Sequence, residues 1–283
     1  MIQFRLWDDC SNNCTFCSLK YRRCFHTPQQ LIERIDAFIQ CLPDIEDKEV
    51  GLIGGELFMS LTPEFTDAWM RLVDAVNNSE IEMLYLATNL LDDFGLLMSV
   101  ISALKKDFWI CTSYDEKGRF FTEEDKKLWK KRLNVLFDTG YKVHCTMIPT
   151  QELITSELDL PDGLSCDICE PIKSPEWYWA VDKEHYHDEL LKCTPVSLPK
   201  RKDMIHWFRD HPLTLAHYLL QENTHANNIC EFRDNKFEDT YTGRFEKNRA
   251  PCGHQYWSRC YADSDKCMMC DAKTIRDDQC RRK

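Results

Sequence analysis

The alternation of strand-like and helix-like segments over the first half of the chain constrains its fold more than any other feature. Short apolar segments with strand character are each followed by a longer segment with helical periodicity. The expected strands cover residues 2–7, 50–53, 83–87, 108–112 and 143–148. Consecutive strand–helix units favour a parallel sheet with its helices outside.

The predicted helices begin at recognisable capping residues. Thr27-Pro28 and Thr62-Pro63 each pair an N-cap residue with proline at the first helical position. Asp92-Asp93 opens the third helix, and Thr122 with three acidic residues opens the fourth, which should stop at Gly140. The side chains expected to face inward are Leu31, Ile35, Phe38, Leu42, Phe65, Trp69, Leu72, Val76, Phe94, Leu97, Val100 and Leu104.

The number of strand–helix units indicates an incomplete barrel. Residues 177–181 supply a sixth expected strand, and right-handed crossovers curl such a sheet towards a barrel. A full eightfold barrel needs more units than the remaining chain holds. We therefore predict an α/β fold with a partial (β/α)6 parallel barrel over residues 1–185. A small cysteine-rich C-terminal subdomain over residues 186–283 follows, because that region lacks the periodicity needed to bury a core unaided.

Charge and cysteine content narrow the classes of function. The 283-residue chain has a net charge of −11, which gives no support to broad contact with a polyanion, and we expect the basic residues 126–132 to be a solvated helix face. No signal peptide and no membrane-length apolar segment are present, so we expect a soluble cytoplasmic protein in a reducing compartment. Many of the 16 cysteines fall in short clusters, which then favours metal or iron–sulfur ligation over disulfides.

The first cysteine cluster has the spacing C-x3-C-x2-C at Cys10, Cys14 and Cys17, directly after the first strand. Three thiolates in one loop can hold three irons of a cubane cluster and leave the fourth iron open for an exogenous ligand. The alternative is a three-cysteine zinc site completed by Cys24 or His26. Zinc sites usually show paired CxxC motifs, and here only one is present.

This spacing after the first strand resembles the signature of the radical S-adenosylmethionine (SAM) superfamily. The resemblance implies a [4Fe-4S] cluster on Cys10, Cys14 and Cys17, with the amino and carboxylate groups of SAM chelating the open iron. It also implies reductive cleavage of SAM to methionine and a 5′-deoxyadenosyl radical, which abstracts a substrate hydrogen. Phe16, directly before the third cysteine, is implied to lie near the adenine.

Three further strand ends resemble the same family in the same order, and the resemblance covers about residues 1–150. Gly54-Gly55-Glu56 resembles its GGE motif, which binds the SAM amino group, although Leu57 stands where proline is more common. Thr88-Asn89 resembles a Thr-Asn-Gly turn with Leu90 replacing glycine, and Ser113-Tyr114-Asp115 resembles a segment that contacts the SAM ribose or carboxylate. The implied cofactor-binding residues are Phe16, Gly54, Gly55, Glu56, Asn89, Ser113 and Asp115.

The second cysteine cluster lies near the end of the chain, at Cys252, Cys260, Cys267 and Cys270. It resembles the auxiliary [4Fe-4S] ligands of SPASM or twitch extensions, although its spacing departs from the SPASM pattern. The alternative is structural zinc, with His254 as a substitute ligand, since ligand type alone does not separate the two. Further candidate ligands are Cys166, Cys169, Cys193 and Cys230.

These features together predict an enzyme that cleaves SAM to a radical and modifies or rearranges a substrate, with an electron donor such as flavodoxin or ferredoxin as partner. The substrate stays open between a peptide, as for SPASM-type maturases, a small molecule and a modified nucleobase. The last option includes isomerase or mutase chemistry on hypermodified DNA, by analogy with radical SAM proteins of viral genomes. The sequence identifies no catalytic side chain, and a zinc-binding module is the non-enzymatic alternative.

Overall fold

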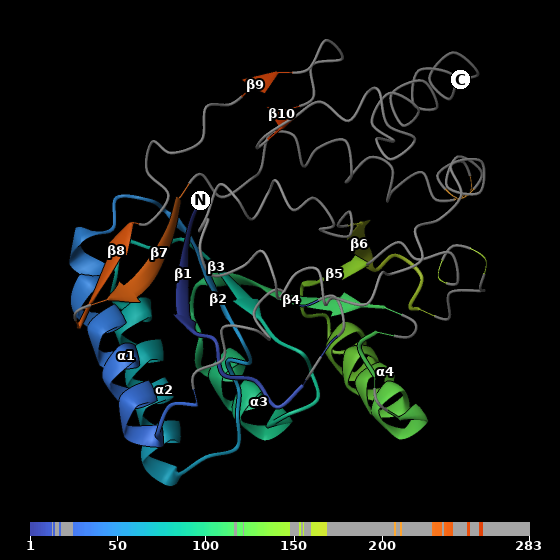
Figure 1. The fold of residues 1–283 in the computed structure, drawn as a ribbon, viewed down its shortest axis with the longest axis horizontal. Helices are drawn as coiled ribbons and strands as arrows, with labels where there is room; N and C mark the ends of the chain where they lie inside the picture. The colour runs from blue at the N-terminus through green and yellow to red at the C-terminus, as the bar shows by residue number, and fades with distance from the viewer. Residues whose placement is uncertain are drawn as a thin grey trace, which may run out of the picture. The chain divides into compact units, whose positions relative to one another are not determined.

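The chain forms a main sheet whose strands alternate with helices along the sequence (Figure 1). The structure, a computed structural model, describes residues 1–12, 14, 17, 25–115, 118–120, 122–147, 153, 155, 160–168, 207, 210, 228–233, 235–239, 248, 249, 255 and 256. The chain divides into two compact units. The first comprises residues 1–112, 122–144 and 226–242, and the second comprises residues 113–121, 145–225 and 243–283.

Strands and helices alternate regularly up to residue 147. The strands are β1 (Ile2–Trp7), β2 (Glu49–Gly54), β3 (Met83–Ala87), β4 (Asp107–Tyr114) and β5 (Val143–Met147). The helices are α1 (Pro28–Cys41), the short 3-10 helix η2 (Leu42–Asp44), α2 (Pro63–Asn77), α3 (Phe94–Ala103) and α4 (Glu123–Asp138). Figure 1 shows α1 to α4 on one face of the sheet, as a series of crossovers of one hand requires.

The main sheet has the strand order β6-β5-β4-β3-β2-β1-β7-β8. The strands β1 to β4 pair in parallel with their neighbours, and β7 (Asn228–Arg233) adds to β1, also in parallel. The strand β8 (Lys236–Asp239) closes an antiparallel hairpin with β7. The predicted α/β fold with an open parallel sheet, as in a partial barrel, is therefore confirmed.

The second half of the chain contributes strands that the sequence did not indicate. The structure forms β6 at Ser165–Ile168, whereas the expected sixth strand at residues 177–181 lies outside the described residues. A separate two-stranded sheet pairs β9 (Asn248–Arg249) with β10 (Gln255–Tyr256). The strand β7 joins the sheet of the first unit from far along the chain, and the predicted domain boundary at residue 185 stays a prediction.

All four predicted helix starts are confirmed. At each start the capping side chain accepts a hydrogen bond from the backbone N–H three residues later, which satisfies a donor that the helix leaves unpaired. The four caps are Thr27, Thr62, Asp93 and Thr122. Helix α4 ends at Asp138, and Gly140 follows at a φ of 86°, in the left-handed region that glycine favours. In the described part of the chain, no helix has both the length and the apolarity to cross a membrane.

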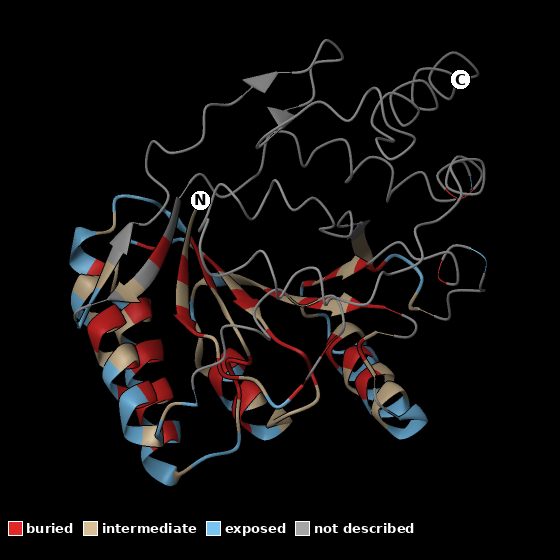
Figure 2. Ribbon diagram, viewed as in Figure 1, coloured by how far each residue is buried: buried red, intermediate tan, exposed pale blue. Residues whose placement is uncertain are grey.

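The core lies between the sheet and the inner faces of the helices (Figure 2). Trp69 of α2 packs edge-on to Trp7 of β1, with ring centroids 6.3 Å apart, and stacks on Phe58 at 5.0 Å. The predicted inward faces of α1 and α2 are confirmed, since all of their named residues are buried. The prediction for α3 is wrong at its two ends. Phe94 and Leu104 are half-buried, because Phe94 is the first helical residue and Leu104 follows the last one.

Candidate functional site

The three cysteines of the first cluster follow β1 in one segment. Cys14 is buried, with 7% of its surface exposed, and Cys10 and Cys17 are half-buried. The Cys17 N–H donates to the Cys14 carbonyl at 3.2 Å, so the backbones of these two residues are in contact. Among the described residues, no three Cys, His, Asp or Glu side chains lie close enough to hold one metal ion. As a donor set, three thiols from one loop suit an iron–sulfur cluster.

The turn after β3 contacts the cysteine loop through polar side chains. The Asn89 amide nitrogen Nδ2 donates to the Asp92 carboxylate at 2.7 Å and lies 3.9 Å from the Cys10 sulfur. The Ser11 hydroxyl donates to the same carboxylate oxygen at 2.6 Å. Asp92 therefore links the end of β3 to the segment that carries the cysteines. Sequence reasoning assigned Asp92 only to a helix start and missed this role.

The backbone of this turn has an unusual conformation at Leu90. Leu90 has a φ of 60°, a left-handed conformation in which glycine is normally favoured. The Asn89 side-chain oxygen Oδ1 compensates by accepting from the Leu91 N–H at 2.6 Å and the Asp92 N–H at 3.2 Å. Thr88-Asn89 is therefore followed by a turn in which Leu90 takes the backbone conformation that glycine favours, even though leucine replaces the glycine of the Thr-Asn-Gly type.

Glu56 lies at the end of β2 and is fully buried, with 0% of its surface exposed. Its carboxylate accepts hydrogen bonds from the Phe58 N–H at 2.9 Å, the Thr88 hydroxyl at 2.9 Å and the Asn89 N–H at 2.5 Å. Burial raises the pKa of this carboxyl from its ordinary value of 4.5 to about 7. Glu56 thus joins the end of β2 to the end of β3.

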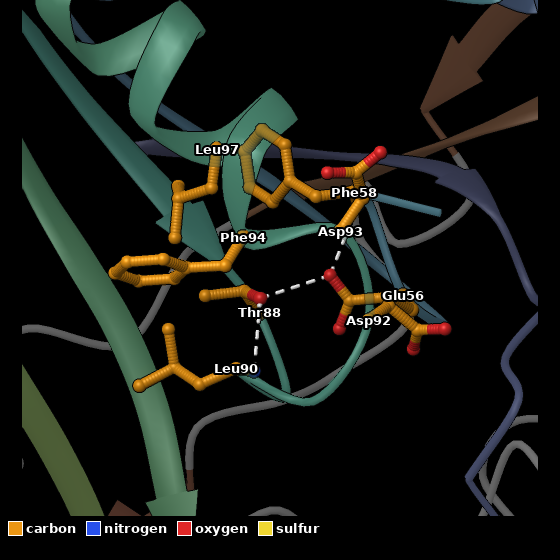
Figure 3. A pocket seen from close by; sticks show the side chains of 8 residues that line it. All are labelled: Glu56, Phe58, Thr88, Leu90, Asp92, Asp93, Phe94 and Leu97. Carbon is orange, nitrogen blue, oxygen red and sulfur yellow. Dashed lines mark hydrogen bonds between the residues drawn. The ribbon is translucent and has the colours of Figure 1, made fainter. Parts of the chain in front are cut away.

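A small pocket, with no room for a water molecule, lies beside this carboxylate (Figure 3). Its lining includes the polar residues Glu56, Thr88 and Asp92 and apolar side chains such as Phe94 and Leu97. Figure 3 shows the Thr88 hydroxyl between the Glu56 carboxylate and the Leu90 backbone. The pocket is too small for a nucleoside, so it belongs to the support of the site rather than to a cofactor cavity.

The two glycines before Glu56 allow a close contact between strand ends. A Cβ atom on Gly54 would lie 2.1 Å from the Trp7 carbonyl oxygen, and one on Gly55 would lie 1.8 Å from the Asp9 carbonyl oxygen. The Gly55 and Glu56 N–H groups donate to these same carbonyls at 2.8 and 2.7 Å. The backbone that the glycines approach is therefore the one that leads into Cys10. Their contact with SAM stays a prediction.

Arg132 of α4 stabilises the turn after β3 through hydrogen bonds to the backbone of that turn. Its guanidinium donates to the Leu90 and Asp92 carbonyls, both at 2.9 Å, and lies over the Phe94 ring at 5.3 Å. Burial lowers the pKa of Arg132. The expectation that residues 126–132 form a solvated face is thus wrong for Arg132, because its partners come from a distant turn that helical periodicity does not reveal.

His26, the alternative zinc ligand, has both ring nitrogens engaged by protein groups. Its Nδ1 lies 2.5 Å from the Asp9 carboxylate, and its Nε2 lies 2.7 Å from the Arg34 guanidinium. Sequence reasoning did not connect these three residues. Asp9 precedes Cys10 and His26 precedes the N-cap of α1. Their position on either side of the cysteine loop is the sequence feature that could have indicated a contact between them.

Ser113 and Asp115 belong to the second compact unit. The Ser113 hydroxyl accepts from the Arg119 guanidinium, and the Asp115 carboxylate accepts from the Gly118 N–H. Asp115 and Arg119 are both buried, and Arg119 was not predicted. The predicted residues that the structure connects through one network are Cys10, Gly54, Gly55, Glu56 and Asn89. Phe16, Cys252, Cys260, Cys267 and Cys270 lie outside the described residues.

The fold is similar to that of a solved structure of histidine-tagged anSMEcpe "with bound AdoMet". The two chains are 14% identical, and the alignment has a TM-score of 0.50 and covers 77% of this chain and 59% of that chain. "Native anSMEcpe with bound AdoMet and Cp18Cys peptide" aligns with 13% identity and a TM-score of 0.49, over 77% of this chain and 59% of that one. No protein-family model matches the sequence. No curated protein matches it either. The first likeness establishes a shared fold, and this chain spans 59% of the length of that protein.

Proposed function

We propose that this protein is a radical SAM enzyme whose [4Fe-4S] cluster is held by Cys10, Cys14 and Cys17. The observation that carries the proposal is the network joining the cysteine loop to the ends of β2 and β3 through Asp92, Asn89 and the backbone of Glu56. When bound, the cluster and SAM together supply one-electron cleavage of the sulfonium to a 5′-deoxyadenosyl radical. The fold likeness to a structure with bound AdoMet supports this proposal.

The protein residues orient and support this site. The Asn89 amide N–H groups beside the Cys10 sulfur supply the kind of hydrogen bonding that surrounds cluster thiolates. The Glu56 carboxylate has about four lone-pair sites, and three protein donors occupy three of them. We assign the remaining site, on Oε2, to the ammonium group of SAM. We assign Phe16, Gly54, Gly55, Ser113 and Asp115 to the remaining SAM contacts on the family resemblance.

Metal analysis tests the proposal and separates it from a zinc-binding module. We expect protein purified without oxygen to contain iron and acid-labile sulfide in equal amounts, with a broad absorption near 400 nm. Cys14→Ala should lose the iron of the cluster on Cys10, Cys14 and Cys17, because two thiolates cannot hold it, whereas Cys41→Ala in the last turn of α1 should keep it. Stoichiometric zinc without sulfide in the wild-type protein would reject the enzyme and favour the binding module.

We also propose an auxiliary [4Fe-4S] cluster on Cys252, Cys260, Cys267 and Cys270, in an extension over residues 186–283. The alternative for these ligands is structural zinc. Replacing Cys267 and Cys270 together by alanine should lower the iron content from about eight to about four atoms per chain. Unchanged iron with loss of zinc would assign the second site to zinc.

The substrate that we favour is a peptide, since the C-terminal cysteines resemble those of SPASM-type maturases. A small molecule is the second class. A modified nucleobase, with isomerase or mutase chemistry, is the third, and the net charge of −11 gives DNA binding no support. Salt-sensitive binding of DNA would favour the nucleobase. An electron donor such as flavodoxin or ferredoxin completes the proposed partners.

A further inference from the structure

The two ends of the cysteine loop are fastened together by Asp9 and His26. The His26 backbone N–H donates to one Asp9 oxygen at 2.6 Å, and the ring nitrogen Nδ1 lies 2.5 Å from the other oxygen. Asp9 directly precedes Cys10, and His26 lies two residues before α1. The bidentate contact therefore spans the whole segment that carries Cys14 and Cys17.

The third member of this group, Arg34 of α1, fixes the tautomer of the histidine. A guanidinium can only donate hydrogen bonds, so His26 Nε2, 2.7 Å from Arg34, must accept. The ring proton then resides on Nδ1, where it donates to the Asp9 carboxylate. The result is a carboxylate and a guanidinium joined through a neutral imidazole, with no net charge.

This group, which we call the loop clasp (Asp9, His26 and Arg34), is anchored to the sheet. Arg34 donates a second hydrogen bond to the Leu6 carbonyl of β1 at 2.9 Å, and its guanidinium lies 4.6 Å from the centre of the Phe232 ring of β7. Asp9 is 5% exposed, so water competes little for its carboxylate. The clasp thus ties the cysteine loop to α1, β1 and β7 at once.

We propose that the loop clasp sets the position of the three cluster cysteines, and that His26 is a positioning residue for the cluster rather than a metal ligand. This inference rests on the proposed function, because its first test measures iron release from the cluster. With both ring nitrogens used inside the clasp, His26 has no lone pair to offer a metal. The clasp fixes both ends of the loop and so reduces the conformations among which the thiolates must be selected when a cluster binds.

The test uses three substitutions of His26 that separate the two sides of the clasp. His26→Asn places an amide N–H near the position of Nδ1 and keeps the bond to Asp9. His26→Gln places its amide near Nε2 and keeps, of the two side-chain contacts, only the one with Arg34. His26→Ala loses both side-chain contacts, and Asp9→Asn opposes an amide donor to one of the two His26 N–H groups that the Asp9 carboxylate accepts from. Each full-length protein is loaded with its cluster, and iron release to an excess of chelator is timed.

We expect His26→Asn to release iron within about threefold of the wild-type rate. His26→Gln, His26→Ala and Asp9→Asn should release it about tenfold faster or more, as expected for loss of a buried hydrogen bond to a carboxylate. Wild-type release rates in His26→Gln and Asp9→Asn would overturn the proposal, and so would an Asn variant as fast as the Gln variant. Circular dichroism identifies any variant that fails to fold, and the Asn–Gln comparison then carries the test.

A second readout is independent of the cluster. Trypsin sites at Lys20, Arg22 and Arg23 lie between Asp9 and His26 in the sequence. In the metal-free chain, we expect cleavage at these sites to be about tenfold faster in His26→Gln than in the wild type, with His26→Asn close to the wild type. Equal rates in all variants would reject the clasp. A wild-type protein that binds no iron but shows this order would instead reject only the proposed function.

Discussion

The Glu56 carboxyl group is fully buried, and its burial gives the stability of the protein a pH dependence. Its pKa is raised to about 7 in the folded protein by burial, against 4.5 when exposed. Between these values the folded state binds more protons than the unfolded state, so stability falls as pH rises from about 4.5 through about 7.

We predict that the wild-type protein loses about 2 kcal/mol more stability between pH 5 and pH 8 than Glu56→Gln, which has no carboxyl group to titrate at this position. Urea unfolding of both proteins at the two pH values measures the difference. Parallel changes in the two proteins would show that Glu56 is not the group responsible.

Asn89 has a second role beside shaping its turn, because its amide nitrogen lies 3.9 Å from the Cys10 sulfur. Hydrogen bonds to cluster sulfurs stabilise the more negative, reduced state. We predict that Asn89→Ala lowers the midpoint potential of the cluster by about 50 mV, which corresponds to one hydrogen bond of ordinary strength.

The matched control for this prediction is Asn77→Ala. Asn77 donates to the Ala103 carbonyl at 3.0 Å, at the end of α3 away from the cysteine loop, and should leave the potential unchanged. A redox titration followed by electron paramagnetic resonance measures both variants. Equal potentials in wild type and Asn89→Ala would remove Asn89 from the cluster environment.

At the scale of elements, the end of β2 is positioned by contacts that tolerate no side chain. A Cβ at Gly55 would overlap the Asp9 carbonyl, whereas a Cβ at Gly51 in the same strand would meet the flexible side chain of Gln3 at 3.1 Å. We predict that Gly55→Ala costs about 3 kcal/mol of unfolding free energy or more, and Gly51→Ala less than about 1 kcal/mol. Chemical denaturation of the two variants compares them. Similar stabilities would mean that the ends of β1 and β2 can move apart without loss of unfolding free energy.

The elements also show why part of the fold was predictable. Helices α1 and α2 follow from Thr27-Pro28 and Thr62-Pro63, because capping chemistry acts within one turn of the chain. The strand β7 could not be predicted in its place, since its partner β1 lies more than 200 residues earlier in the sequence. Asn235, a residue type that tolerates the left-handed φ of 63° it adopts, is a local sequence feature consistent with the turn between β7 and β8.

At the scale of the whole molecule, parallel topology is what made the site predictable. The carboxyl ends of β1, β2 and β3 meet at one edge of the sheet, so Cys10, Glu56 and Asn89 could be grouped from sequence alone. Arg132 and Arg34 could not be added to this group from sequence. Each lies on a helix, and the apolar pattern of a helix does not predict which distant group one long side chain will contact. The sequence thus predicts which strand ends form the site and leaves their supports to the tertiary structure.

The central claim is that this arrangement of strand ends supports reductive cleavage of SAM. The most direct measurement is 5′-deoxyadenosine formation, after the full-length protein is reconstituted anaerobically with iron and sulfide and then given dithionite and SAM. We predict product from the wild type and from Cys41→Ala, and none above background from Cys14→Ala. A sample with a full complement of cluster that forms no 5′-deoxyadenosine would contradict the claim.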